Sequence, residues 1–352
     1  MIIFTNKTFP LVRRALPTYI LSLLLLSACG GNQSDTANET FVSAEEKWEL
    51  LAPEGMHPLT STLDSMDVRN PFITYERKSN CYYMVGDGGH MWLSKDLRLW
   101  NGPYNVLRHD ASSWLGSKPL VSSPEIHKHG NRYYYMATFE VPGDSVAAAD
   151  GRLFTRRSCV SLVADSITGP YKTIDKEAQL LDVREMAEHP TYCSDDLDVG
   201  YMIYDCSYEQ NDNGTVQIVR YTENVANRMG EAYVMFTAQD VPWSSSPLIE
   251  SPFLFYTDGG MMGMLFTAMY GDGKAVGVAY STTGMLDGPW EVEPEPLLKG
   301  VGGAMMFRDY DGSLVLVAAK DTVIGGVSRS VPQLYRMDSQ FEKLQVKRHY
   351  KF

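Results

Sequence analysis

Three residues able to do chemistry stand beside a proline that recurs along the chain. Glu250 lies two residues before one such proline, and His189 and Asn70 each directly precede another. A carboxyl such as that of Glu250 donates a proton near neutrality if its pKa is raised. An imidazole accepts a proton at pH 7, whereas an amide only forms hydrogen bonds. The three residues are therefore a candidate acid, a candidate base and a group that positions water or a hydroxyl.

The proline belongs to a segment with five copies, each a strand start followed by a turn and an apolar strand. The copies are Asn70-Pro71-Phe72-Ile73, Ser123-Pro124-Glu125-Ile126, His189-Pro190-Thr191-Tyr192, Ser251-Pro252-Phe253-Leu254 and, more weakly, Gly303-Ala304-Met305-Met306. They recur at intervals of roughly 50 to 65 residues, and a unit of this size made of strands and turns cannot bury its faces alone. The pattern predicts an all-β fold, a five-bladed β-propeller.

Each repeat is expected to open with a β-hairpin. The turns are predicted at residues 78–80, 129–131, 195–200, 257–260 and 309–312, where turn-forming residues separate β-rich runs. A second motif, Gly-Pro followed by an aromatic residue, recurs in the outer part of three repeats, as Gly102-Pro103-Tyr104, Gly169-Pro170-Tyr171 and Gly288-Pro289-Trp290. Three copies at equivalent places support the repeat.

The start of the chain predicts export and lipid anchoring. Residues 1–28 combine basic residues with a short apolar run, which is typical of a signal peptide rather than a spanning helix. The tetrad Leu26-Ser27-Ala28-Cys29 resembles a bacterial lipobox, so we expect lipidation of Cys29; an ordinary secretory signal with an incidental cysteine is the alternative. Residues 29–45 are polar and predict a flexible stalk, and 46–352 are expected to form one propeller domain. Gly30 after the cysteine favours the outer membrane or cell surface.

Charge and cysteine content narrow the possible partners. The formal net charge is −12, and removal of residues 1–28, which hold three basic residues and no acidic one, makes it −15. This acidity argues against nucleic acid and for neutral or cationic ligands. Besides Cys29 there are Cys81, Cys159, Cys193 and Cys206, without the spacing of a zinc site. Disulfides are possible in an oxidising compartment, but buried free thiols are the simpler interpretation.

Several segments carry a resemblance to a known family. They are Arg69-Asn70-Pro71, the stretch 124–134, the stretch 250–254, and the stretch 276–281 continued through Gly288-Pro289-Trp290. Together they resemble glycoside hydrolase family 43, and the similarity spans roughly residues 64 to 320. The family comprises five-bladed propellers, mostly arabinanases, arabinofuranosidases and xylosidases, and many members are lipoproteins of gut Bacteroidetes. The resemblance implies a carbohydrate ligand bound where the repeated segments converge.

The resemblance also implies three catalytic carboxylates, of which two are altered here. Glu250 stands where the general acid belongs, Asn70 where the base Asp is expected, and His189 where an Asp modulates the pKa of the acid. His189 is a possible displaced base, but its charged form beside Glu250 would lower the pKa of that carboxyl. Asp67 or Glu188 could replace a lost carboxylate, although Glu188 would need an irregular backbone to reach the site.

Other positions add candidate binding residues and remove some family features. Glu125, Trp92, Tyr208 and Trp243 are candidates for contact with a sugar. Ser122-Ser123 stands where the family often has Trp-Ala, and Gly302-Gly303-Ala304-Met305 lacks the histidine that binds calcium in some relatives. We therefore expect no metal and no cofactor.

Two hypotheses remain open at the level of sequence. The first is a glycosidase, weakened or non-standard, that acts on plant-type polysaccharides or oligosaccharides with Glu250 as the acid. The second is a surface glycan-binding lipoprotein without turnover. A propeller that binds protein is a weaker third possibility, and we expect a monomer.

Overall fold

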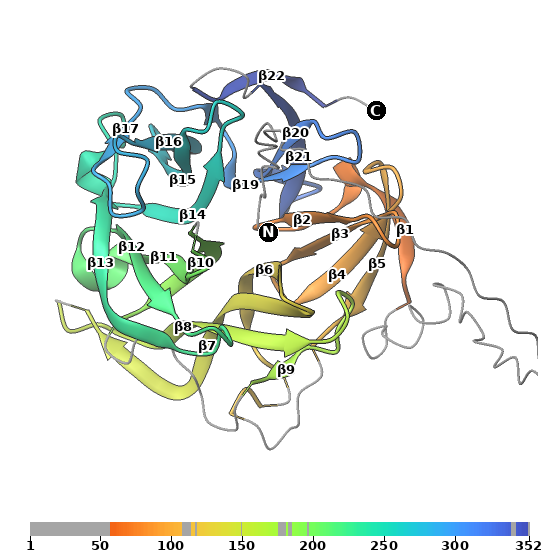
Figure 1. Cartoon of the computed structure of the whole chain (residues 1–352), viewed down its shortest axis with the longest axis horizontal. Coiled ribbons are helices and arrows are strands. Elements are labelled where there is room, and N and C mark those ends of the chain that lie inside the picture. The colour runs from red at the N-terminus through yellow and green to blue at the C-terminus, as the bar shows by residue number, and fades with distance from the viewer. Residues whose placement is uncertain are drawn as a thin grey trace, which may run out of the picture.

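The computed structural model describes residues 57–107, 114–116, 118–148, 150–174, 181, 185–195, 197–338 and 343–350. Five antiparallel sheets stand around one axis, and the first long strand of each lies innermost (Figure 1). The predicted all-β, five-bladed propeller is confirmed. The expected signal peptide, the lipidated Cys29 and the stalk to residue 45 lie outside the described residues, as do residues 46–56 of the expected domain.

Each sheet corresponds to one repeat and is numbered here as a blade. Blade 1 has the strand order β1-β5-β4-β3-β2, blade 2 β6-β7-β8-β9, blade 3 β10-β11-β12-β13, blade 4 β14-β15-β16-β17 with β18 paired to β16, and blade 5 β19-β20-β21-β22. The bounds are β1 Leu59–Thr62, β2 Phe72–Glu76, β3 Cys81–Gly86, β4 His90–Ser94, β5 Leu99–Asn105, β6 Val121–His129, β7 Arg132–Ala147, β8 Leu153–Ala164, β9 Lys172–Thr173, β10 Ala187–Ser194, β11 Gly200–Cys206, β12 Thr215–Tyr221, β13 Arg228–Thr237, β14 Ile249–Tyr256, β15 Met262–Tyr270, β16 Gly273–Ser281, β17 Trp290–Val292, β18 Leu298–Lys299, β19 Gly302–Arg308, β20 Leu314–Ile324, β21 Val327–Asp338 and β22 Gln345–His349. Three short helices interrupt them: η1 Leu63–Ser65, α2 Tyr208–Asn211 and η2 Ala238–Asp240.

The hairpins lie where the turn residues predict them. The five predicted turns fall between β2 and β3, β6 and β7, β10 and β11, β14 and β15, and β19 and β20. In the last of these, Gly312 supplies a φ of +83° that few other residues adopt. The three Gly-Pro-aromatic motifs lie in the outer part of blades 1, 2 and 4, as predicted. Each contains a cis peptide bond, at Gly102-Pro103, Gly169-Pro170 and Gly288-Pro289.

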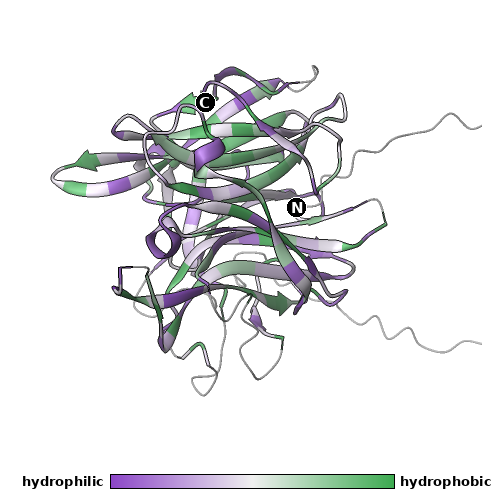
Figure 2. Cartoon of the chain, turned by 90° about the vertical axis from the view of Figure 1, so that its left-hand side faces the viewer, coloured by the Kyte–Doolittle hydropathy of each residue, from purple (hydrophilic) through white to green (hydrophobic). Residues whose placement is uncertain are grey.

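Apolar side chains between neighbouring sheets hold the blades together. Strand β3 is buried along its whole length, and Trp100, Tyr135 and Phe266 are fully buried. Along the blades, hydrophobic segments lie mainly on the strands and hydrophilic segments at turns and loops (Figure 2). Burial of large aromatic and aliphatic side chains is the main stabilising contribution in such a core.

Blades 5 and 1 close the ring through hydrogen bonds. The N–H of Val68 donates to the carbonyl of Ser330 at 2.8 Å, and the N–H of Ser330 donates to Oδ1 of Asp67 at 2.8 Å. The Tyr82 hydroxyl donates to the buried carboxylate of Asp309 across the same junction. Asp67 is thus used in ring closure, and the suggestion that it replaces a catalytic carboxylate gains no support.

The four cysteines other than Cys29 lie in the described residues. Cys81, Cys159, Cys193 and Cys206 are buried free thiols, as expected. Burial raises the pKa of the Cys193 thiol to about 12, so that it is protonated at neutral pH. No helix in the described ranges is long and apolar enough to cross a membrane.

Candidate active site

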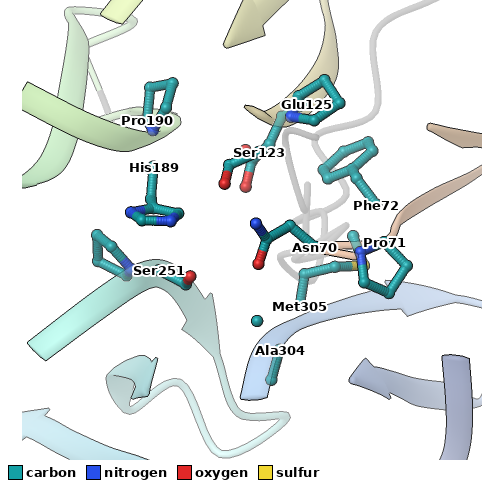
Figure 3. A pocket seen from close by; sticks show the side chains of 13 residues that line it. Asn70, Pro71, Phe72, Ser123, Glu125, His189, Pro190, Ser251, Ala304 and Met305 are labelled. Atoms are coloured by element: carbon teal, nitrogen blue, oxygen red, sulfur yellow. The ribbon is translucent and has the colours of Figure 1, made fainter. Parts of the chain in front are cut away.

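The repeated proline segments meet around one hollow on the propeller axis. It is lined by residues from all five blades: Asn70, Pro71, Phe72, Ser123, Pro124, Glu125, His189, Pro190, Ser251, Pro252, Gly303, Ala304 and Met305. In Figure 3 the side chains of Asn70, Ser123, His189 and Ser251 surround its centre. The convergence that the repeat predicts is therefore present, and it brings Asn70 and His189 to one place.

A left-handed backbone aims these residues at the axis. Asn70, Ser123, His189, Ser251 and Gly303 have φ values of 49°, 48°, 50°, 56° and 59°. In blades 2 to 5 a break in strand pairing spans the same position. Non-glycine residues rarely adopt this conformation, and such strain is stored at functional sites. Each of these blades thus uses one bulged residue to line the hollow.

Hydrogen bonds between neighbouring blades hold the left-handed residues. The acceptor is always a side-chain oxygen on, or directly after, the second strand of the preceding blade: Asp87 accepts from the N–H of Ser123 at 2.8 Å, Thr138 from His189 at 2.8 Å, Asp205 from Ser251 at 2.9 Å and Thr267 from Gly303 at 2.9 Å. At the fifth junction the equivalent residue is Ala319, which has no side-chain oxygen. These acceptors were not predicted from the sequence, although they occupy equivalent places when the second strands of the blades are aligned.

Asn70 is bound to one of these acceptors. Its Nδ2 donates to Oδ1 of Asp87 at 3.1 Å, and its Oδ1 lies 2.5 Å from where a Cβ at Gly303 would be. Burial raises the pKa of the Asp87 carboxyl, while its two N–H donors oppose the shift. The amide of Asn70 is thus fixed on both sides and presents no proton acceptor of sufficient basicity to the hollow.

His189 is bound to the equivalent acceptor in blade 3. Its Nδ1 lies 2.9 Å from Oδ1 of Asp205, whose side chain is buried. Burial disfavours the charged imidazolium, but the negative charges of Asp205, Glu250 and Glu188 outweigh it and raise the pKa of His189 to about 10. At neutral pH His189 is therefore a cation. An imidazolium accepts no proton, so this geometry speaks against its use as a displaced base.

Glu250 lies at the start of β14 and forms an ion pair with a lysine of the same blade. Its Oε1 lies 2.7 Å from Nζ of Lys274 on β16. Burial favours the neutral acid, but the charges of Lys274 and His189 outweigh it and lower the pKa of Glu250 below its ordinary value. The predicted effect of charged His189 on this carboxyl is confirmed. The raised pKa that a general acid needs is absent in this state, because two cations stabilise the carboxylate.

Glu188 is the blade-3 counterpart of Glu250. Its Oε1 lies 2.9 Å from Nε of Arg157, which also binds Glu209 on α2 at 2.7 Å. Burial raises the pKa of Glu188 to about 7, although His189 and Arg157 oppose the shift. The irregular backbone that Glu188 would need exists at His189, but the side chain is engaged by Arg157 and does not line the hollow.

Glu125 lines the hollow from blade 2. Its Oε2 lies 2.6 Å from Nε2 of the buried His127. Burial raises the pKa of the Glu125 carboxyl to about 8. It is a carboxyl in the lining of the hollow that holds a proton near neutrality.

The three aromatic candidates lie elsewhere. Trp92 is in the middle of β4, the third strand of blade 1, and meets His90 edge to face. Trp243 stacks on Phe266 in the core, with ring centroids 6.0 Å apart. Tyr208 begins α2, in the loop that follows the hollow-facing end of β11, and is half-buried. None of the three lines the hollow, and only Tyr208 lies on a loop beside it.

The described residues contain no group of three or more His, Cys, Asp or Glu side chains that could hold a metal ion. The polar groups around the hollow include two ion pairs, His189 with Asp205 and Glu250 with Lys274, the carboxyl of Glu125 beside His127, and the amide of Asn70.

Comparison with known proteins supports the family resemblance. The sequence profile described as glycosyl hydrolases family 43 matches residues 63–318. A search of curated proteins found no match. Among solved structures, an endo-arabinase from Bacteroides thetaiotaomicron VPI-5482 has a TM-score of 0.67 and 24% identity, over 80% of this chain and 98% of that one. An endo-1,4-beta-xylanase from the same organism has a TM-score of 0.65 and 17% identity, over 82% and 97%. An exo-1,5-alpha-L-arabinanase from a bovine ruminal metagenomic library has 0.60 and 16%, over 80% and 97%. At these identities the structures share the fold.

Proposed function

Because the chain belongs to glycosyl hydrolases family 43, we propose that it cleaves arabino- or xylo-configured glycans of plant type, slowly and with a non-standard transfer of protons. The observation that supports the proposal is that Asn70 of blade 1 and His189 of blade 3 line one hollow on the axis, and that Glu250 of blade 4 directly precedes Ser251, which also lines it. The resemblance assigns the family's three catalytic positions to Asn70, His189 and Glu250. The similar structures named as arabinase, xylanase and arabinanase support the choice of substrate class.

Inverting hydrolysis needs an acid for the leaving oxygen and a base for the attacking water. Glu250 supplies a proton only after substrate displaces Lys274 or excludes water, since either change raises the pKa of the carboxyl. Asn70 orients the attacking water, and the proton that this water loses passes to bulk solvent because the amide cannot accept it. Loss of a general base reduces the rate by about 10²–10⁴, so the turnover expected is slow rather than absent.

A second function, glycan binding without cleavage, is favoured by one specific observation. The side chains at the proposed acid and base positions already have partners within the protein. Oε1 of Glu250 lies 2.7 Å from Nζ of Lys274, and Nδ2 of Asn70 donates to Oδ1 of Asp87 at 3.1 Å. A fixed set of donors and acceptors suits recognition of sugar hydroxyls, because preorganised groups lose little entropy on binding.

One experiment separates the two functions. Purified protein is incubated with aryl-arabinosides, aryl-xylosides, arabino-oligosaccharides and xylo-oligosaccharides, while product release and calorimetric binding are both measured. Release that Glu250→Gln abolishes, and that Glu291→Gln at an exposed site on β17 leaves unchanged, supports the glycosidase. Binding without release in the wild type supports the binding protein. Absence of both overturns the proposal.

We also propose that the protein acts as a monomer tethered by lipid at Cys29 to the outer membrane or cell surface. The basis is the lipobox-like tetrad Leu26-Ser27-Ala28-Cys29. Metabolic labelling with a fatty-acid analogue tests the tether. Label that persists in Cys29→Ala, or protein that stays soluble in the wild type, contradicts it.

A further inference from the structure

Arg69 directly precedes Asn70, which lines the hollow, and its position recurs in every blade. The residues directly before the left-handed positions are Arg69, Ser122, Glu188, Glu250 and Gly302. The carbonyl of Arg69 accepts the N–H of Asp87 at 3.1 Å, as expected of a residue that continues the pairing of β2 with β3. At the same position of the repeat, Glu188 pairs with the second strand of blade 3 and Glu250 pairs with the second strand of blade 4. Arg69 is therefore the blade-1 counterpart of these two carboxylates.

The other basic side chains next to these carboxylates are already engaged. Lys274 binds Glu250, Arg157 binds Glu188 and Glu209, and His189 binds Asp205. Arg69 differs from them, because its side chain is exposed and forms no ion pair or hydrogen bond with any residue in the described ranges. It is a free guanidinium beside a candidate sugar site.

The charge of Arg69 acts on carboxylates beside the hollow. Burial raises the pKa of Glu250, Lys274 and His189 lower it, and Arg69 adds a smaller contribution to the lowering. Arg69 likewise opposes the effect of burial on Asp87, whose Oδ1 is occupied by two N–H donors. Arg69 thus acts on both carboxylates through space while remaining unpaired.

We propose that Arg69 binds the carboxylate of a uronic acid unit in the glycan, so that the preferred ligand is an acidic rather than a neutral oligosaccharide. The inference rests on the proposed function, since it places a glycan at the hollow. A planar guanidinium presents two parallel N–H donors that match the two oxygens of a carboxylate. The hydroxyl groups of neutral pentoses offer no such partner.

The expected size of the preference for an acidic ligand follows from the exposure of the Arg69 side chain. Asp87 and Glu250 lie near enough to repel an incoming anion, and the expected mature chain carries a net charge of −15. An exposed ion pair contributes at most about fivefold to an equilibrium constant. We therefore expect a preference of about fivefold for the acidic ligand, and we expect added salt to weaken it.

The test uses ligands that differ only in charge. Calorimetry compares a galacturonate trimer with its methyl ester, and a xylo-oligosaccharide bearing a glucuronate with the unbranched one; neutral arabino-oligosaccharides form a third arm. Tighter binding of either acid than of its neutral partner, lost as ionic strength rises, is the result expected. Binding of the neutral glycans without any preference for the acids overturns the inference and leaves the proposed function standing. Binding of no glycan overturns both.

Variants assign the preference to one residue. Arg69→Gln should abolish the preference for the acid and leave the affinity for the neutral partner unchanged, and Arg69→Lys should keep part of it. Arg77→Gln is the matched control, because Arg77 is also an exposed arginine of blade 1 but lies in the turn at the opposite end of β2. A preference that survives Arg69→Gln, or that Arg77→Gln removes equally, overturns the assignment.

Discussion

Nζ of Lys274 lies 2.7 Å from Oε1 of Glu250, and this ion pair keeps the candidate acid in its charged form. Lys274 extends from β16, the strand that follows β15 in the same blade, so the pair is internal to blade 4. Glu250 is the residue that we propose as the proton donor. Its availability as a proton donor therefore depends on Lys274.

Replacement of Lys274 by methionine should raise the pKa of Glu250. The largest effect that stabilises the carboxylate is removed, while burial, which favours the neutral acid, remains. Carboxyl ¹³C chemical shifts followed against pH measure the change, and any hydrolysis should extend to higher pH. Lys299→Met is the control, because Lys299 lies on β18 of the same blade beside Glu295. An unchanged pKa would show that Lys274 does not control this group.

Asn70→Asp should destabilise the fold when made alone. The new carboxylate would lie about 3 Å from that of Asp87, and two like charges at this distance cannot both ionise. A loss of about 1–3 kcal/mol is expected in urea unfolding at pH 7. Combining Asn70→Asp with Asp87→Asn should recover part of it, because the amide at position 87 removes the second negative charge and its oxygen can still accept from Ser123.

The double variant Asn70→Asp with Asp87→Asn also tests function. It places a carboxylate in the base position without a repelling neighbour, so any hydrolysis should rise relative to the wild type. A single Asn70→Asp variant as stable as the wild type would contradict the hydrogen bond between residues 70 and 87.

Gly303→Ala should be more costly than an alanine at another glycine of the same conformation. The new Cβ would lie 2.5 Å from Oδ1 of Asn70, and φ is +59°. Gly312→Ala is the control, since φ is +83° there and nothing lies within 4 Å. Backbone strain of about 1–2 kcal/mol is common to both, and the clash adds about 1–3 kcal/mol at 303 alone.

A double-mutant cycle isolates that clash. In an Asn70→Ala background the extra cost of Gly303→Ala should disappear, leaving only the strain. Equal losses at 303 and 312 in the wild-type background would show that Asn70 does not occupy the space over Gly303.

His189 should make stability depend on pH between about 6.5 and 10. Its pKa is about 10 in the folded protein because of Asp205, Glu250 and Glu188, which is above the ordinary value of 6.5. Because the pKa is raised on folding, protonated His189 stabilises the folded state fully below pH 6.5. This stabilisation falls by roughly 1.4 kcal/mol per pH unit between pH 6.5 and 10, and it is lost as pH rises through 10. The advantage of the wild type over His189→Gln in urea unfolding should therefore shrink from pH 6 to pH 10. Parallel curves for the two proteins would contradict a charged His189.

Much of the framework follows from local patterns. The prolines after residues 70, 123, 189 and 251 identify strand starts, and the repeat predicts that they meet. Hairpin turns such as 309–312 follow from Gly and Asp, whose backbone preferences are local. Trp92 was a candidate for contact with a sugar, but it lies mid-strand on β4 and does not line the hollow. Its aromatic ring alone did not reveal how far the third strand of a blade lies from the axis.

The sequence by itself determined the repeat, the propeller and the repeated segments that meet at its axis, since periodic strands and turn residues act over a few positions. Only the tertiary structure decided the charge of those residues. Asp87, Asp205 and Lys274 reach Asn70, His189 and Glu250 through strand pairing over 17, 16 and 24 positions. Protonation depends on the nearest charges in space and on burial, and neither is fixed until the sheets have formed.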